Sequence, residues 1–171
     1  GIDARDRRRY LTLLDYYSAR LYNYAGQPGK AVPLFRRVLP AAHEFQDPEL
    51  ILVPSLFLGN SMGFNGQVTQ AIALLEPTVV PMERLFGKDI DTLRAHLYLA
   101  ICMGMAGRYD SLAQLIGHVK PWAAEIQQVV YSGLFHMLSG LALFVSADWP
   151  AAVAATEIAI KIASELKEPL L

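Results

Sequence analysis

His43 and Asp47 are spaced like a pair of metal ligands. They are four residues apart, so on a helix both side chains lie on one face and can reach a single ion. No third ligand follows at a matching spacing, and Pro48 comes directly after the pair. A solvated helix end explains the two residues better than a metal site, so the sequence predicts no metal here.

Four polar residues, spaced about 40 residues apart along the chain, form a polar column and offer a second kind of chemistry, the binding of a ligand or of protons. A shared face of this kind could hold a ligand or respond to pH through its histidines. Equivalent atoms on stacked helices lie ~10 Å apart, however, which is too far for direct hydrogen bonds between them. Four separately satisfied side chains are therefore the alternative, and the sequence leaves both open. The column consists of Asp15, Ser55, His96 and His136.

The sequence lacks the motifs of catalysis and cofactor binding. It contains no GxxxxGK[ST] loop, no GxGxxG turn and no GxSxG elbow. Its one cysteine, Cys102, lies between Ile101 and Met103 and is expected to be an inert core thiol. The chain is therefore predicted not to be an enzyme and to need no cofactor.

Composition narrows the class of protein further. The 171 residues are 53% hydrophobic and 18% charged, which is typical of a folded domain and not of a disordered chain. A single cysteine fits a reducing compartment, so a cytoplasmic location is expected. The most apolar stretch, residues 129–145, is interrupted by serine, glycine and histidine, so no membrane span is predicted.

Charge is divided unevenly along the chain. Residues 1–40 carry eight basic and three acidic side chains, a net charge of +5, whereas residues 41–171 carry a net charge of −6. Such a split can orient a partner. Because the whole chain has a net charge of −1, nucleic-acid binding is not expected. Residues 1–7 are expected to form a basic linker. A cluster of arginines runs from it into the first helix, namely Arg5, Arg7, Arg8 and Arg9.

Small residues repeat with a period of about 40 and predict helical hairpins. The turn column, spaced by 40, 41 and 40 residues, is Gly26, Gly66, Gly107 and Ala147. The column seven residues earlier is Ala19, Gly59, Ala100 and Gly140, and the column five residues later is Ala31, Ala71, Leu112 and Ala152. A glycine with positive φ can close the first helix of a hairpin, and small residues let the second helix approach closely.

The segments around the turns resemble the tetratricopeptide repeat. They read AGQPGKA, NGQVTQA, AGRYDSL and SADWPAA, with a period longer than the usual 34 residues of that family. The longer hairpins are similar to the helical repeats of large bacterial signalling ATPases and transcription activators. The resemblance implies an all-α solenoid of four antiparallel helix hairpins in a right-handed superhelix. Its repeat domain covers 8–171, with hairpins at about 8–46, 47–87, 88–126 and 127–167.

Apolar spacing predicts the individual helices of these hairpins. Prolines late in three of the second helices should kink or end them, because proline removes a backbone hydrogen bond. These are Pro40, Pro81 and Pro121. The predicted helices are 8–25, 28–45, 49–64, 67–85, 90–105, 108–124, 127–145 and 148–166.

The end of the sequence repeats the beginning of a hairpin. Residues 168–171 read EPLL and stand 121 residues after DPEL at 47–50 in the same register. We expect them to start a fifth hairpin, and the chain to be a piece of a longer protein. The helix at 150–166 is apolar on most sides, so we expect a homodimer through the C-terminal helices.

The resemblance also predicts where a partner binds. First helices line the inner, concave face of such a solenoid. The predicted site residues on this face are Tyr16, Arg20, Tyr24, Asn60, Phe64 and Arg94. Some family members hold a terminal carboxylate with paired lysine and asparagine, but Leu56 stands here where the lysine would be.

Two functions follow from this face. The first is a protein-interaction or effector-sensing domain of a larger multidomain signalling or transcription-regulatory protein. It would bind a protein or peptide, or alternatively a small effector. The second is a structural spacer or oligomerisation surface with no ligand of its own.

The repeat register makes a direct prediction about stability. Gly59→Leu and Ala71→Leu should each lower the free energy of unfolding by about 1–3 kcal/mol, because both overpack a tight helix pair. The same increase in size at an exposed site should have little effect. Denaturant midpoints measure the difference, and unchanged midpoints in both variants would show that the register is wrong.

Overall fold

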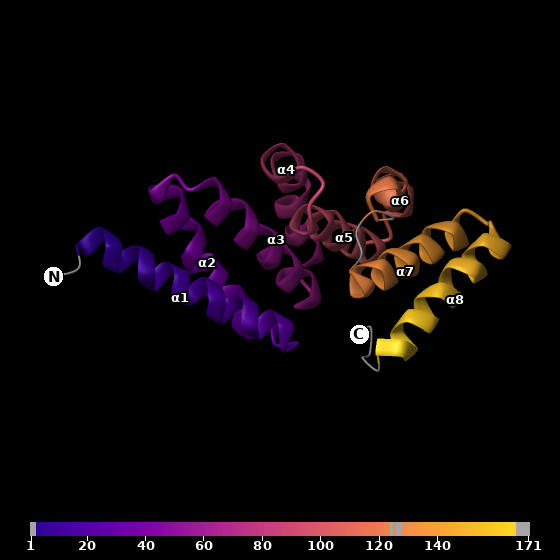
Figure 1. The fold of residues 1–171 in the computed structure, drawn as a ribbon, viewed down its shortest axis with the longest axis horizontal. Coiled ribbons are helices and arrows are strands. Elements are labelled where there is room, and N and C mark those ends of the chain that lie inside the picture. Colours follow the sequence, from indigo (N-terminus) through magenta and orange to yellow (C-terminus); the bar gives the residue numbers. More distant parts are fainter. Residues whose placement is uncertain (1–2, 124, 126–127, 167–171) are drawn as a thin grey trace. The chain divides into compact units, whose positions relative to one another are not determined.

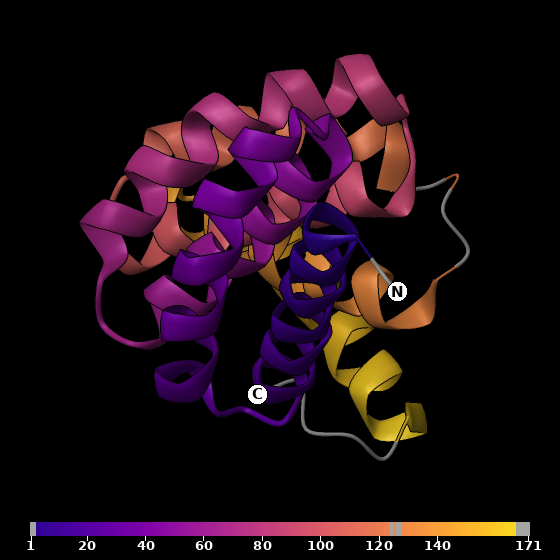
Figure 2. The ribbon, with the colours of Figure 1, turned by 90° about the vertical axis from the view of Figure 1, so that its left-hand side faces the viewer.

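A computed structural model describes residues 3–123, 125 and 128–166, and every regular element in that part of the chain is an α-helix (Figures 1 and 2). The predicted all-α fold is thereby confirmed. None of these helices is long and apolar enough to cross a membrane. The helices are α1 (Ala4–Tyr24), α2 (Pro28–Phe45), α3 (Pro48–Phe64), α4 (Val68–Phe86), α5 (Ile90–Met105), α6 (Tyr109–Ala123), α7 (Val129–Val145) and α8 (Trp149–Leu166).

Seven of the eight helices begin and end within two residues of their predicted bounds, and α1 is the exception. The carboxylate of Asp3 accepts a hydrogen bond from the backbone N–H of Arg5 at 2.8 Å and caps the helix. Residues 4–7 therefore form the first turn of α1, and their prediction as a linker was wrong. Residues 168–171, the expected start of a fifth hairpin, lie outside the described residues.

Contacts divide the chain into two compact units, residues 1–82 and 83–171, with the division inside α4. In unit 1, α2 contacts α1 and α3, and α1 also contacts α3. In unit 2, α6 contacts α5 and α7, α5 also contacts α7, and α8 contacts α7. Figure 1 shows α7 and α8 as such a pair, joined by a tight turn. Within each unit, consecutive helices pack on one another and the two first helices also touch, as stacked hairpins require.

The same turn closes the first helix of all four hairpins. In each, the turn residue bonds to the carbonyl three residues back and its successor bonds to the carbonyl five residues back, which is the Schellman pattern. The turn residues adopt positive φ: Gly26 at 66°, Gly66 at 80°, Gly107 at 72° and Ala147 at 62°. The predicted turn column is confirmed, including the one position that is not glycine.

The predicted close approach within a hairpin is confirmed in the second and fourth pairs. A Cβ added to Gly59 would lie 2.4 Å from Cγ of Leu75, and one added to Gly140 would lie 2.5 Å from Oγ1 of Thr156. The nearest neighbour of Gly59 is Leu75, one turn beyond Ala71, the residue that the repeat pattern paired with it. Ala71 itself has no exposed surface, so a larger side chain is excluded there too.

A kink or an early end was expected at three late prolines, and the early end does not occur at two of them. α2 continues five residues beyond Pro40, and α4 continues five residues beyond Pro81. The residues just beyond them are buried, namely Ala41 and Ala42 in α2 and Met82 in α4, so packing compensates for the lost hydrogen bond. α6 does end at Ala123, two residues after Pro121.

Replacing Ala147 by glycine should stabilise the protein. Alanine in the left-handed conformation costs about 1–2 kcal/mol, whereas glycine adopts it without a steric penalty. We expect Ala147→Gly to raise the melting temperature. The matched control is Ala106→Gly, since Ala106 also ends a first helix but has φ −85°. That variant should be neutral or destabilising, and equal effects of the two substitutions would contradict the strained turn.

Candidate functional site

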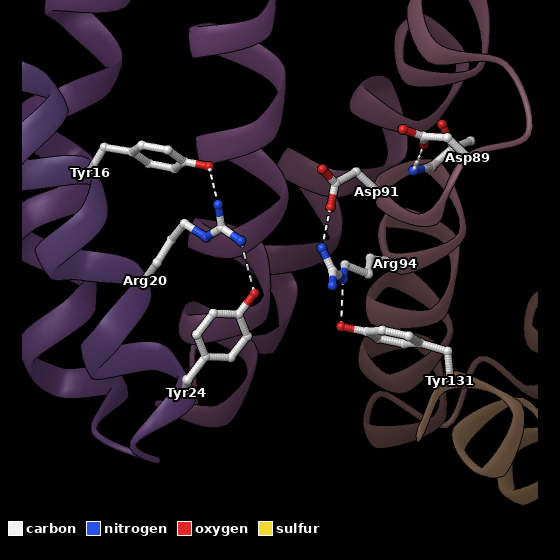
Figure 3. A network of polar contacts seen from close by, with 8 residues as sticks. Tyr16, Arg20, Tyr24, Asp89, Asp91, Arg94 and Tyr131 are labelled. Atoms are coloured by element: carbon white, nitrogen blue, oxygen red, sulfur yellow. Dashed lines mark hydrogen bonds and ion pairs between the residues drawn. The ribbon is translucent and has the colours of Figure 1, made fainter. Parts of the chain in front are cut away.

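Three residues of α1 form a polar and aromatic cluster in unit 1. Tyr16, Arg20 and Tyr24 are successive i, i+4 neighbours, so their side chains share one face of the helix. The guanidinium of Arg20 donates hydrogen bonds to the phenol oxygens of Tyr16 and Tyr24, each at 3.1 Å (Figure 3). The tyrosines thus hold the arginine in a fixed orientation.

The charge of Arg20 is stabilised without a carboxylate. Its guanidinium carbon lies 4.8 Å from the ring centroid of Phe57 on α3, a cation–π distance. Burial alone would lower the pKa of Arg20, but its interactions with Tyr24 and Tyr16 outweigh that effect and raise the pKa. Arg20 takes part in no ion pair among the described residues. The site therefore presents an oriented cation with no internal counter-charge.

A pair of asparagines extends this cluster. Nδ2 of Asn60 donates to Oδ1 of Asn23 at 3.5 Å, and Nδ2 of Asn23 donates to Oγ of Ser61 at 2.7 Å. Oδ1 of Asn60 is buried and accepts no hydrogen bond within the described part of the chain. An unpaired buried acceptor is costly, so this oxygen is suited to receive an N–H from a bound molecule.

Arg94 forms a second cluster, in unit 2. It donates hydrogen bonds to the carboxylate of Asp91 and to the phenol oxygen of Tyr131 (Figure 3). Its guanidinium carbon lies 4.8 Å from the Tyr131 ring centroid. Burial opposes the charge of Arg94, but its interactions with Tyr131 and Asp91 raise the pKa overall. Unlike Arg20, this arginine already has a carboxylate partner.

Five of the six predicted site residues lie in unit 1 and one lies in unit 2. Tyr16, Arg20 and Tyr24 are in direct contact, and Asn60 joins Asn23 on the same pair of helices. Phe64 is exposed at the end of α3, and Arg94 belongs to the other unit.

Phe57 and Tyr131 were not among the predicted site residues, yet each completes an arginine cluster. The signal that could have found them is an offset of 37 residues. It joins Arg20 to Phe57, Asn23 to Asn60 and Arg94 to Tyr131, each across the first helices of adjacent hairpins. The repeat period minus about one helical turn thus predicts which side chains meet.

Three members of the polar column have hydrogen-bond partners outside the column. Arg37 donates two hydrogen bonds of 3.0 Å to the carboxylate of Asp15. Ser55 donates to the carbonyl of Ile51 at 2.7 Å. Burial lowers the pKa of His136, whose ring packs on Phe135. The fourth member, His96, pairs with Glu83, which the sequence analysis did not consider.

Two other sequence interpretations are confirmed. Asp47 caps the N-terminal end of α3 by accepting the N–H of Leu50 at 3.1 Å. It also pairs with Arg9 at 2.9 Å. Cys102 is buried, and burial raises the pKa of its thiol to about 11, which keeps it protonated and inert.

Comparison with known proteins identifies the fold. No protein-family model and no curated protein matches the sequence. Among solved structures, a putative kinesin light chain from Podospora anserina, described as having nearly identical TPR-like repeats, is similar over 98% of this chain and 99% of its own. The TM-score is 0.54 and the sequence identity is 17%. The chain therefore has a TPR-like repeat fold.

Proposed function

We propose that this chain is a protein-interaction repeat domain that binds an acidic peptide segment against α1 and α3. The observation that carries the proposal is the cation of Arg20, oriented by two phenols and lacking a carboxylate partner. A carboxylate of a bound peptide would supply the missing charge through a charge-assisted hydrogen bond.

Neighbouring groups on the same helices suit a peptide. The unpaired Oδ1 of Asn60 can accept a backbone N–H, and extended peptides present such donors at regular intervals. Tyr24 is 54% exposed and Phe64 is 42% exposed, so both offer aromatic surface for side-chain contacts. Aromatic and arginine residues are the usual anchors of protein interfaces. Leu56 is fully buried, so the family's lysine–asparagine carboxylate clamp has no counterpart at this position.

The proposal extends to the setting of this domain. A repeat module of this kind would serve within a larger cytoplasmic signalling or transcription-regulatory protein, where partner binding on α1 and α3 controls another domain. The reduced, buried thiol of Cys102 is compatible with that location. A small effector bound at the same cluster is the alternative ligand, recognised by the same cation and amide.

A second role, self-association, is supported by the α7–α8 face. An open apolar groove of about 600 Å³ runs between these helices and is lined by residues that include Phe144, Trp149, Val153 and Ile160. In the preceding hairpin, Gly104 of α5 faces Leu141 of α7, so the corresponding surface there is covered. Phe144 and Val153 stand 40 residues after Gly104 and Ala113, in the same register. We propose that a second copy covers this groove in a homodimer.

Peptide binding can be tested with a pair of variants. The probe is an acidic fluorescent peptide from a random library. We expect it to bind at least tenfold more weakly to Arg20→Gln, and to the double variant Tyr24→Ala with Phe64→Ala, than to the native chain. Circular dichroism should show unchanged helicity. The control is Tyr10→Ala, an equally exposed tyrosine elsewhere on α1. Equal affinity of all variants, or preference for basic peptides, would place the site elsewhere.

Self-association can be tested separately by sedimentation. The native chain should dimerise at tens of micromolar, and Val153→Glu with Ile160→Glu should yield a monomer, because two charges would enter the apolar interface. The comparison variant is Leu14→Glu, which changes an exposed side chain on α1. A native monomer would rule out the dimer, and dissociation by Leu14→Glu alone would move the contact to α1.

A further inference from the structure

Glu83, His96 and His118 meet in unit 2 from three different helices. They lie near the end of α4, within α5 and within α6. Nε2 of His96 is 2.7 Å from Oε1 of Glu83, and Nε2 of His118 is 3.1 Å from the same oxygen. One ligand-type atom from each residue falls within 4.8 Å of the other two.

We propose that these three side chains bind a divalent transition-metal ion of the zinc class. Two imidazole nitrogens and one carboxylate oxygen form a ligand set that zinc and its neighbours prefer, whereas magnesium and calcium prefer oxygen alone. Residues brought from three helices would also be crosslinked by the ion. The proposal is independent of the peptide site on α1 and α3.

The three ligand atoms lie within 4.8 Å of one another, so binding an ion requires the side chains to move. Ligand atoms around a tetrahedral zinc with bonds of ~2.0–2.1 Å lie ~3.3 Å apart. The two distances to Glu83 are shorter than that by a few tenths of an ångström. The side chains of Glu83 and His118 are partly exposed and can move outward, which also leaves a fourth position open to water.

His96 provides the fixed wall of the site. Its side chain is buried, and its ring packs edge-on against Trp122, with centroids 5.2 Å apart. The His118 ring contacts the same indole at 5.0 Å, so Trp122 orients both imidazoles. Burial lowers the pKa of His96 more than Glu83 raises it, and this keeps the ring in the neutral form that ligates metals.

The second ring nitrogen of His96 sets the expected affinity. Nδ1 is buried and has no hydrogen-bond partner within the described residues. Metal-ligating histidines usually donate this N–H to a carbonyl or carboxylate, and losing such a partner weakens binding about 10–100-fold. We therefore expect zinc to bind about 10–100-fold more weakly than at a site whose histidine has this partner.

Calorimetric titration of the untagged, chelator-treated chain with zinc chloride tests the site. We expect one ion per chain, a higher melting temperature with zinc, and no response to magnesium chloride. His118→Gln should weaken zinc binding at least tenfold while leaving the metal-free melting temperature nearly unchanged, because this side chain is half-exposed. Cobalt(II) should give visible absorption bands with the native chain and lose them with His118→Gln.

The control variant is His43→Gln, which removes an exposed histidine far along the sequence from the cluster. It should bind zinc like the native chain. If zinc fails to bind below millimolar concentration, or if both histidine variants bind equally, the cluster is only a hydrogen-bonded arrangement of two imidazoles around one carboxylate and the proposal is wrong.

Discussion

The distance between the two helices of a hairpin is the constraint on which the rest of this structure depends. Where Gly59 faces Leu75 and Gly140 faces Thr156, side chains of the second helix pack directly against the glycine and leave no room for a Cβ atom. The identical Schellman turns fix the direction in which each second helix returns. The turn is thus shared by all four hairpins, and the tight spacing is shared by the second and fourth.

Repetition of that hairpin positions the functional side chains. Because first helices of adjacent hairpins touch at an offset of 37 residues, side chains distant in sequence meet regularly: Phe57 lies against Arg20, and Tyr131 lies against Arg94. The two arginine clusters share this geometry but differ in charge. Asp91 neutralises Arg94, whereas Arg20 has only phenols and rings around it. That difference makes α1 and α3 the more suitable surface for an anionic partner.

The sequence predicted the helices and their turns because the signals are local. Small residues at a fixed period mark each turn, and Asp47 and Pro48 mark the beginning of α3. What the sequence could not predict depends on contacts between helices. The Glu83–His96–His118 cluster joins residues 13 and 35 positions apart, with no motif spacing. Residues 4–7 are helical because the carboxylate of Asp3 caps the start of α1. The run of arginines that follows had favoured the prediction of a linker.

The repeat register is the central claim, and proton–proton contacts in solution test it most directly. A nuclear Overhauser spectrum of the labelled chain should show strong contacts from the Gly59 α-protons to the Leu75 methyl groups, and from the Gly104 α-protons to a Leu141 methyl group. These two contacts report the spacing within a hairpin and the offset between hairpins. Contacts from Gly59 to Ala71 or Val79 in place of Leu75 would mean that the helices are shifted by one turn and would contradict the account.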